Sequence, residues 1–330
     1  METEIIINPS QEVFEEIVKW SGETEDWAFQ LGDYDFWRNN FDQLWFFTLF
    51  EKESKNLIGS VSLARWDSDG EKPLYSIACY YILPEYRGGS YGRIIFDKAM
   101  QIVGNDNVTL SGVTNMVEKY SKFYGFDKIA PYFHVYTTIK LADLSIPSDL
   151  SDLYETKNWK NVDSGLLNEY DLTICSRKRQ NIQNAWFNLK NTFTKVAFEK
   201  STGKIVGYST IRIVERNKLS VAPLYADNLK VASRLFADIL NEIPNLQNFK
   251  SVSLLYPGAN QDGLKLAQLF LQESKFRRLL QVPIYSRISS ITKPKSFLSF
   301  RLCSSICLNF AISEIFTYSL KILNKLNYLP

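Results

Sequence analysis

Residues 83–93, LPEYRGGSYGR, form the stretch that decides the fold of this chain. An apolar run rich in Tyr and Ile, residues 74–83, leads into it, and a helical pattern over residues 91–103 follows it. Three glycines, Gly88, Gly89 and Gly92, let the main chain turn tightly and approach a ligand closely. The pattern predicts a strand, a ligand-binding loop and a helix.

The start of that helix is the second reason to expect a ligand. The first N–H groups of a helix have no partner inside the helix, and the positive end of the helix dipole lies beside them. Such a helix start suits a pyrophosphate. The alternative is a glycine-rich turn from strand to helix that binds nothing.

The run Pro-Glu-Tyr-Arg-Gly-Gly-Ser-Tyr-Gly after a strand resembles the acyl-CoA loop of the GNAT acyltransferases, usually written Arg/Gln-x-x-Gly-x-Gly/Ala. Arg87 and Gly92 fit this pattern, whereas Ser90 stands where a central glycine is usual, so its side chain narrows the approach there. The resemblance implies acetyl-CoA as co-substrate. It assigns cofactor binding to Leu83, Arg87, Gly88, Gly89, Ser90, Tyr91, Gly92 and Arg93.

Residues 114–126, TNMVEKYSKFYGF, resemble the second GNAT hallmark, in which an Asn opens a helix that contains a Tyr and is followed by Gly-Phe. The resemblance implies that Asn115 borders the cofactor and that a tyrosine hydroxyl meets the CoA sulfur as it leaves. Five residues separate Tyr120 from Gly125, where four is commoner. The role therefore falls on Tyr120 first and Tyr124 second, and aromatic packing is the alternative for both.

The catalytic base is harder to assign. Glu85 is a candidate that would act through water, although Pro-Glu before such a loop also simply suits a turn. Cys79 has no histidine near it in the sequence, and His134 lies in an apolar run, so both are interpreted as core residues. Only four cysteines and one histidine are present, widely scattered, so no metal site is expected.

Composition predicts a folded protein with two domains. The chain has 330 residues, of which 45% are hydrophobic and 22% charged, with a net charge of +2. Acidic residues at the start differ from a secretory or mitochondrial signal, so we expect a cytoplasmic protein. We expect no nucleic-acid partner. The uncharged run 302–313 is too short for a membrane span, and the oligomeric state stays open.

An internal repeat supports two domains of one fold. Phe50-Glu51-Lys52, followed by Ile58-Gly59, is echoed by Phe198-Glu199-Lys200 and Val206-Gly207 at one offset. On that basis Leu83-Pro84 is aligned with Ala222-Pro223, and the second copy lacks the glycine loop. Its Asp227 would place a negative charge where a phosphate should lie.

We therefore predict an α/β (α+β) fold of two GNAT-like modules, each a mixed, mostly antiparallel twisted sheet flanked by helices. The predicted boundaries are an N-terminal acyltransferase domain over residues 1–141, a linker over 142–161, a second module without the glycine loop over 162–285, and a divergent tail over 286–330.

The segment 23–42 mixes aromatic and acidic residues, and in GNAT proteins the corresponding segment borders the acceptor site. An acidic and aromatic rim would favour a small-molecule or peptide amine as acceptor. The alternative is that the aromatic residues pack in the core and the acids face solvent. Three functions follow: an acetyl-CoA-dependent N-acyltransferase, a non-catalytic acyl-CoA-binding or sensor protein, and a pure interaction protein.

Overall fold

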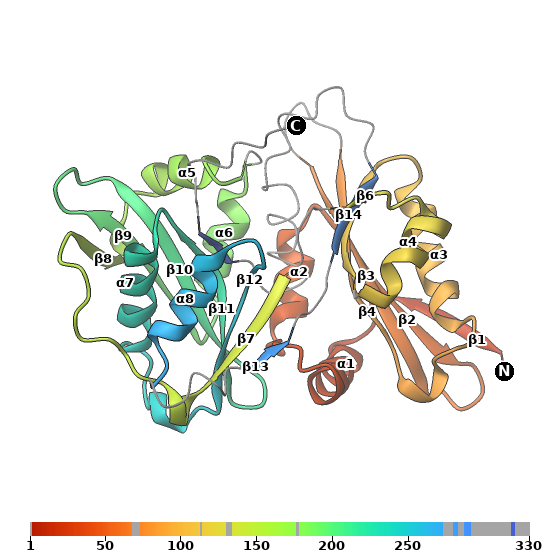
Figure 1. Cartoon of the computed structure of the whole chain (residues 1–330). Coiled ribbons are helices and arrows are strands. Elements are labelled where there is room, and N and C mark those ends of the chain that lie inside the picture. Colours follow the sequence, from red (N-terminus) through yellow and green to blue (C-terminus); the bar gives the residue numbers. More distant parts are fainter. Residues whose placement is uncertain are drawn as a thin grey trace.

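The computed structural model describes residues 2–67, 73–112, 114–129, 134–175, 178–272, 280–282, 287–291 and 318–320. They form two mixed sheets with helices, as predicted (Figure 1). The expected tail run 302–313 lies outside the described residues. None of the helices in the described part has both the length and the apolar character needed to cross a bilayer.

The first sheet has the strand order β1-β2-β3-β4-β5-β14-β6. The parts of the chain that build it and its helices are β1 (Thr3–Ile7), α1 (Gln11–Thr24), α2 (Asp33–Asn40), β2 (Gln43–Glu51), β3 (Leu57–Trp66), β4 (Leu74–Ile82), a 3-10 turn η1 (Pro84–Tyr86), α3 (Tyr91–Val103), β5 (Asn107–Gly112), α4 (Thr114–Tyr124), β6 (Lys128–Ile129) and β14 (Arg287–Ile291).

The second sheet has the order β13-β7-β12-β11-β10-β9-β8. Its elements are β7 (His134–Lys140), η2 (Leu141–Asp143), β8 (Tyr154–Asn158), η3 (Trp159–Asn161), α5 (Ser164–Leu172), α6 (Gln180–Phe187), β9 (Thr192–Glu199), β10 (Ile205–Val214), β11 (Lys218–Ala226), α7 (Leu229–Leu240), η4 (Leu246–Asn248), β12 (Ser251–Pro257), α8 (Gln261–Leu269) and β13 (Leu280–Val282). A short strand, β15 (Tyr318–Leu320), pairs with β11 in parallel.

Two strands exchange sheets. β7 lies within residues 1–141, predicted as the N-terminal domain, but it pairs with β12 in the second sheet. In return β14, from the region predicted as a divergent tail, pairs with β5 in the first sheet. The predicted linker also contains β8, which pairs with β9. The sheets therefore cross the predicted module boundaries, because strand pairing depends on contacts between distant parts of the chain.

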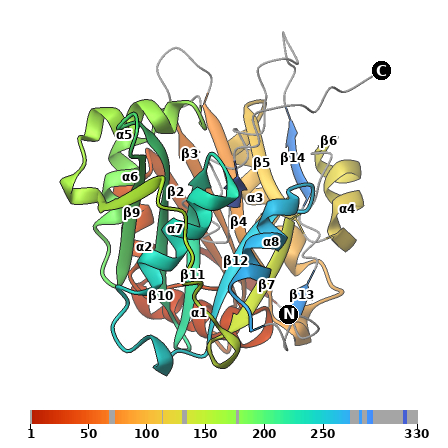
Figure 2. The same cartoon turned by 60° about the vertical axis from the view of Figure 1, so that its left-hand side comes forward.

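The buried apolar residues of the described part form three large cores. Helices α3 and α4 pack on the first sheet around Phe96, and α7 and α8 pack on the second sheet around Phe236 (Figures 1 and 2). A third core lies between the modules and joins α1 and α2 to residues of the second sheet, such as Tyr208 and Tyr225. The two modules therefore share one hydrophobic core.

Candidate functional site

The glycine loop lies where the sequence placed it, between β4 and α3. The Leu83 amide donates to the Ile58 carbonyl at 3.0 Å, which extends the ladder to β3 by one bond. After η1, the Arg87 amide donates to the Pro84 carbonyl at 3.2 Å, and Gly88 has φ +86°. That left-handed conformation favours glycine. The residues from Arg87 to Ser90 are exposed to solvent.

The start of α3 is open. Its N-cap residue, Ser90, makes no side-chain hydrogen bond to the helix. The amides of Tyr91, Gly92 and Arg93 belong to the first turn, whose N–H groups have no helical acceptor. An exposed loop and these amides match the donor set that a pyrophosphate requires.

Gly92 serves packing. A Cβ at this position would overlap the hydroxyl of Tyr80 on β4, so only glycine allows α3 to lie this close to the strand. At Gly89, by contrast, a Cβ would meet the Tyr91 ring at 3.4 Å, an ordinary contact. Substitutions that test ligand binding therefore belong at Gly89. Sequence reasoning did not identify Tyr80, because its partner is a glycine on another element.

Beside the loop, β4 and β5 separate. Their parallel pairing runs from Leu74 with Asn107 to Ile77 with Leu110, and β4 then bulges at Cys79, which has φ +49°. The Ser60 hydroxyl donates to the Cys79 carbonyl at 2.9 Å and holds the bulge. Beyond this point the two strands continue to Ile82 and Gly112. The site therefore lies where a loop, a helix start and two separating strands meet.

Tyr120 is a core residue of the first module. It is 5% exposed, and its ring stacks on that of Phe96 with centroids 5.4 Å apart. The ring of Tyr80 packs edge-on against it, with centroids 6.5 Å apart. A Cβ at Gly112 would meet the Tyr120 ring at 2.7 Å. Burial raises the pKa of its hydroxyl far above the usual range. The packing predicted as the alternative is present, and contact with a leaving sulfur stays a prediction.

Tyr124 joins the two helices of this module. Its hydroxyl donates to Asp97 Oδ1 on α3 at 2.6 Å, and its ring lies 4.5 Å from that of Phe96. Burial, and then the bond to Asp97, raise the pKa of the hydroxyl. Asp97 was not singled out from the sequence, although its place four residues after Arg93 is an ion-pair spacing. Asn115 is the second residue of α4.

Arg87 is held beside the loop. Its Nε donates to the Ile82 carbonyl at 2.8 Å, its guanidinium pairs with Glu25 at 2.9 Å, and it lies 5.4 Å from the Tyr81 ring. Glu25, at the end of α1, belongs to the acidic segment 23–42, but its pairing with Arg87 was not predicted. Glu85 is exposed on η1. The structure thus brings Glu25, and not Glu85, into contact with the loop arginine.

The expected acidic rim is wrong for Asp33, which is buried. Asp33 forms an ion pair with Arg212 of β10 at 2.5 Å, and both side chains are fully buried. Asp26 pairs with Arg216 at 3.0 Å and also with Lys218. These carboxylates join the modules. The neighbouring aromatic residues pack in the shared core, as the alternative stated, among them Tyr34, Phe36 and Trp37.

Two other reactive groups have structural surroundings. Burial raises the pKa of the Cys79 thiol to about 12, so the thiol stays protonated and is a poor nucleophile. His134 is 1% exposed in β7 of the second sheet. Within the described ranges, His, Cys, Asp and Glu side chains do not gather in threes as a metal site would require.

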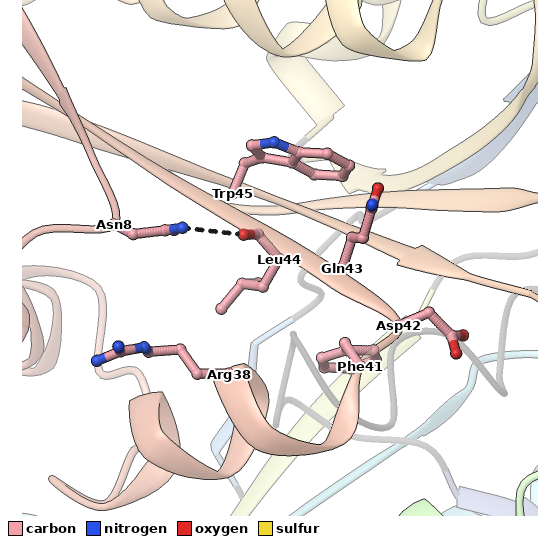
Figure 3. Close-up of a pocket in the computed structure, with 7 residues that line it drawn as sticks. All are labelled: Asn8, Arg38, Phe41, Asp42, Gln43, Leu44 and Trp45. Atoms are coloured by element: carbon pink, nitrogen blue, oxygen red, sulfur yellow. Dashed lines mark hydrogen bonds between the residues drawn. The ribbon is translucent and has the colours of Figure 1, made fainter.

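A surface pocket lies away from the loop. Its volume is about 340 Å³, and Figure 3 shows the residues around it, from β2, α2 and the end of β1: Asn8, Arg38, Phe41, Asp42, Gln43, Leu44 and Trp45. Asn8 bonds to the backbone of Leu44 at 3.2 Å and of Phe46 at 2.8 Å, so it fastens β1 to β2. The pocket contains none of the predicted catalytic or cofactor-binding residues, but Arg38, Phe41 and Asp42 belong to the segment 23–42 predicted to border the acceptor site.

The second module closes the equivalent helix start. Ala226 pairs with Gly207 as Ile82 pairs with Gly59, so Ile82 and Ala226 are equivalent. The alignment of Leu83-Pro84 with Ala222-Pro223 is therefore wrong. Only Asp227 and Asn228 lie between the end of β11 and the start of α7. The Asn228 side chain accepts a hydrogen bond from the Val231 amide at 3.0 Å. Asp227 accepts from the Tyr170 hydroxyl at 3.0 Å.

Comparison with known proteins agrees with this geometry. Residues 1–174 match the family described as "Protein of unknown function (DUF1248)", which is more than half of the chain. The chain belongs to the DUF1248 family. Residues 167–289 of this DUF1248 protein match the acetyltransferase (GNAT) domain family. Both modules have the GNAT fold.

Relatives of this DUF1248 protein are distant. An uncharacterized protein of Caenorhabditis elegans is 28% identical over 180 residues, which span 50% of this chain and 55% of that protein. A tandem GNAT protein from the clavulanic acid biosynthesis pathway has a TM-score of 0.63 at 12% identity, with 89% of this chain and all of that chain covered. A putative acetyltransferase from Pyrococcus horikoshii gives 0.58 at 13%, with 88% and 90% covered.

Proposed function

We propose that this protein is an acetyl-CoA-dependent N-acyltransferase whose site lies in the first module. The observation that carries the proposal is the exposed loop from Arg87 to Ser90, which leads into the uncapped start of α3. The amides of Tyr91, Gly92 and Arg93, with the guanidinium of Arg87, would hold the pyrophosphate. When bound, acetyl-CoA would supply an acetyl thioester for attack by an amine.

The chain's own groups would orient that amine and its co-substrate. Separation of β4 from β5 leaves backbone groups of β4 after Cys79 outside the pairing with β5. Such groups can orient a substrate by hydrogen bonds, without a covalent enzyme intermediate. Arg87 would exchange Glu25 for phosphate, because two phosphate charges attract a guanidinium more strongly than one exposed carboxylate does. A small-molecule or peptide amine stays the proposed acceptor.

The test is calorimetric titration of the full chain with acetyl-CoA. Gly89→Asp adds a negative charge at a position with room for a side chain, so the affinity should fall by at least about tenfold. Gly89→Asn is the matched control, with the same size and no charge, and should change the affinity less than about threefold. Equal affinity of the Asp variant and the wild type would overturn the proposed site.

A second candidate is a non-catalytic acyl-CoA binder. The observation in its favour is that Tyr120 is buried among Phe96, Tyr80 and Phe126 and not exposed beside the loop. Release of free thiol from acetyl-CoA with a panel of amines separates the two functions. In an enzyme that uses this hydroxyl, Tyr120→Phe should lower kcat by about 10². Binding without thiol release, under any amine tried, would select the binder.

A further inference from the structure

The strand β15 lies in a cleft of the second module, where β11 and β12 separate. These two strands pair in parallel at residues 219–220 of β11, near its start. Further along, β11 pairs with β15 at residues 224–226, again in parallel. Because β10 pairs with these residues on one edge of β11, β15 lies on the other edge, the one on which β12 pairs near the start of the strand. It also lies against β12.

The same backbone positions are open in the first module. Ile82 and Ala226 are equivalent, so residues 80–82 of β4 correspond to residues 224–226 of β11. The pairing of β4 with β5 ends at Ile77, and no strand of the described part pairs with residues 80–82 on that edge. The two modules therefore contain the same cleft, which is open in the first and filled by a strand in the second.

Burial agrees with a filled cleft in the second module. Leu224, Tyr225 and Ala226 are each 0% exposed. Of the equivalent residues on β4, Tyr80 and Ile82 are partly exposed. The end of β11 is therefore covered more completely than the end of β4, as expected for a strand that has a neighbour on each edge.

The helix start beside the second cleft does not suit a pyrophosphate. Asn228 caps α7 by accepting from the Val231 amide at 3.0 Å, and Asp227 places a carboxylate next to this cap. A phosphate there would meet a like charge and a helix start that already has an acceptor. The edge of β11 remains for recognition, and a strand edge recognises the main chain of an extended peptide by hydrogen bonds.

We propose that the second module is a peptide-binding module, in which residues 224–226 of β11 bind an extended peptide by strand addition. In this chain residues 318–320 fill the site. An extended segment of a partner protein replaces β15 by exchanging one set of main-chain hydrogen bonds for an equal set. Because β15 is part of the same chain, its effective concentration at the cleft is high, so a free peptide competes poorly with it.

The test is the binding of a fluorescent peptide with the sequence of residues 314–325, EIFTYSLKILNK, followed by anisotropy on the full chain. Tyr318→Pro with Ser319→Pro weakens β15: neighbouring residues of a strand face opposite edges, so one of the two prolines removes an N–H that faces β11. This double variant should bind the peptide at least about tenfold more tightly than the wild type does. Asn327→Pro with Tyr328→Pro, which follow β15 in the sequence, is the matched control and should bind as the wild type does.

A second measurement uses the wild type alone, so it does not depend on the folding of a variant. The Asp227 amide donates to the Val206 carbonyl at 2.9 Å, so the Ala226 amide faces the opposite edge, where β15 pairs. By the same alternation the Ile82 amide faces away from β3, since the Leu83 amide donates to β3. Without ligand, the Ala226 amide should exchange its hydrogen at least about 100-fold more slowly than the Ile82 amide does.

Each outcome decides the proposal. Equal peptide binding by the wild type and the double proline variant, or binding by neither, would overturn it. Fast exchange of the Ala226 amide in the wild type would overturn it as well. If the double variant instead binds one more equivalent of acetyl-CoA in calorimetry, the cleft is a covered cofactor site. In that case this inference falls and the proposed function of the first module stands.

Discussion

The strand pairs β3–β4 in the first module and β10–β11 in the second have the same structure as far as Ile82 and Ala226. Gly59 and Gly207 occupy equivalent places, and at both a side chain would overlap the carbonyl of a tyrosine, Tyr81 or Tyr225. Strands β4 and β11 both bulge. A serine hydroxyl holds each bulge: Ser60 donates to the Cys79 carbonyl, and Ser209 donates to the Pro223 carbonyl, both at 2.9 Å. The sheet therefore needs the glycine and the bulge in either module.

The plans differ after Ile82 and Ala226. Eight residues, 83–90, connect β4 to α3, but two residues, 227–228, connect β11 to α7. The short connection ends in a capped helix, whereas the long one leaves its helix start open. A cap stabilises a helix by about 1 kcal/mol, and the first module does without it. This difference teaches that the hairpin itself does not require the longer, uncapped connection.

The largest effect is expected from breaking the buried ion pair between the modules, which tests whether they unfold together. Asp33→Asn removes the charge that pairs with buried Arg212, so the free energy of unfolding should fall by about 3 kcal/mol. Urea denaturation measures it. Asp35→Asn, exposed on the same helix, should have little effect. Because the core between the modules is shared, one transition is expected, and two separate transitions would contradict this view.

A second change makes the first connection as short as the second. Replacing residues 83–90 with the dipeptide Asp-Asn removes the exposed loop and places a carboxylate at the helix start. The affinity for acetyl-CoA should fall at least 100-fold, which corresponds to about 2.7 kcal/mol. Calorimetry measures it, with circular dichroism to confirm that the variant folds. A folded variant that still binds tightly would place the cofactor elsewhere.

The shared glycines offer a stability test of the likeness. Gly59→Ala and Gly207→Ala each push a methyl group into a backbone carbonyl, so each should lower the free energy of unfolding by about 2 kcal/mol. Gly32→Ala is the control, since nothing lies within 4 Å of its added Cβ. Thermal and urea unfolding give the values. Tolerance at one glycine and not the other would break the equivalence of the hairpins.

A smaller effect compares the two helix starts directly. Asn228→Ala removes the side-chain cap of α7 and should lower the free energy of unfolding by about 1 kcal/mol. Ser90→Ala removes no cap and should have almost no effect on stability. Urea denaturation of both variants side by side is the measurement. A loss at Ser90 as large as that at Asn228 would show that the start of α3 is capped after all.

The smallest effect concerns Tyr80 and changes the stability of the fold only at alkaline pH. Burial raises the pKa of Tyr80 to about 12, from its usual value near 10. Its neutral phenol therefore contributes stability that is complete below about pH 10 and is lost as the pH rises toward 12. Tyr80→Phe should flatten this alkaline fall in stability, as followed by urea denaturation at several pH values. An unchanged slope would contradict the assignment of Tyr80 to the packed contact with Gly92.

Some features of the two modules could be predicted from the sequence and others could not. The glycine loop between a strand and a helix was predicted, because turns, glycines and strand patterns depend on neighbouring residues. For Tyr120 a catalytic role and core packing stayed open, since its burial depends on Phe96 and Gly112, which lie on other elements. The alignment of Pro84 with Pro223 failed because a shared proline suggested equivalence, whereas strand pairing decides it.

The exchange of β7 and β14 sets the order in which this chain can fold. Ile291 pairs with Val108, 183 residues earlier (291 − 108), so the first sheet gains this strand only when nearly all of the polypeptide is present. Pairing between such distant residues closes a long loop and slows folding. During synthesis, β5 has an unpaired edge until β14 has been made. That edge can pair with other chains, so the N-terminal half is prone to aggregation during this time.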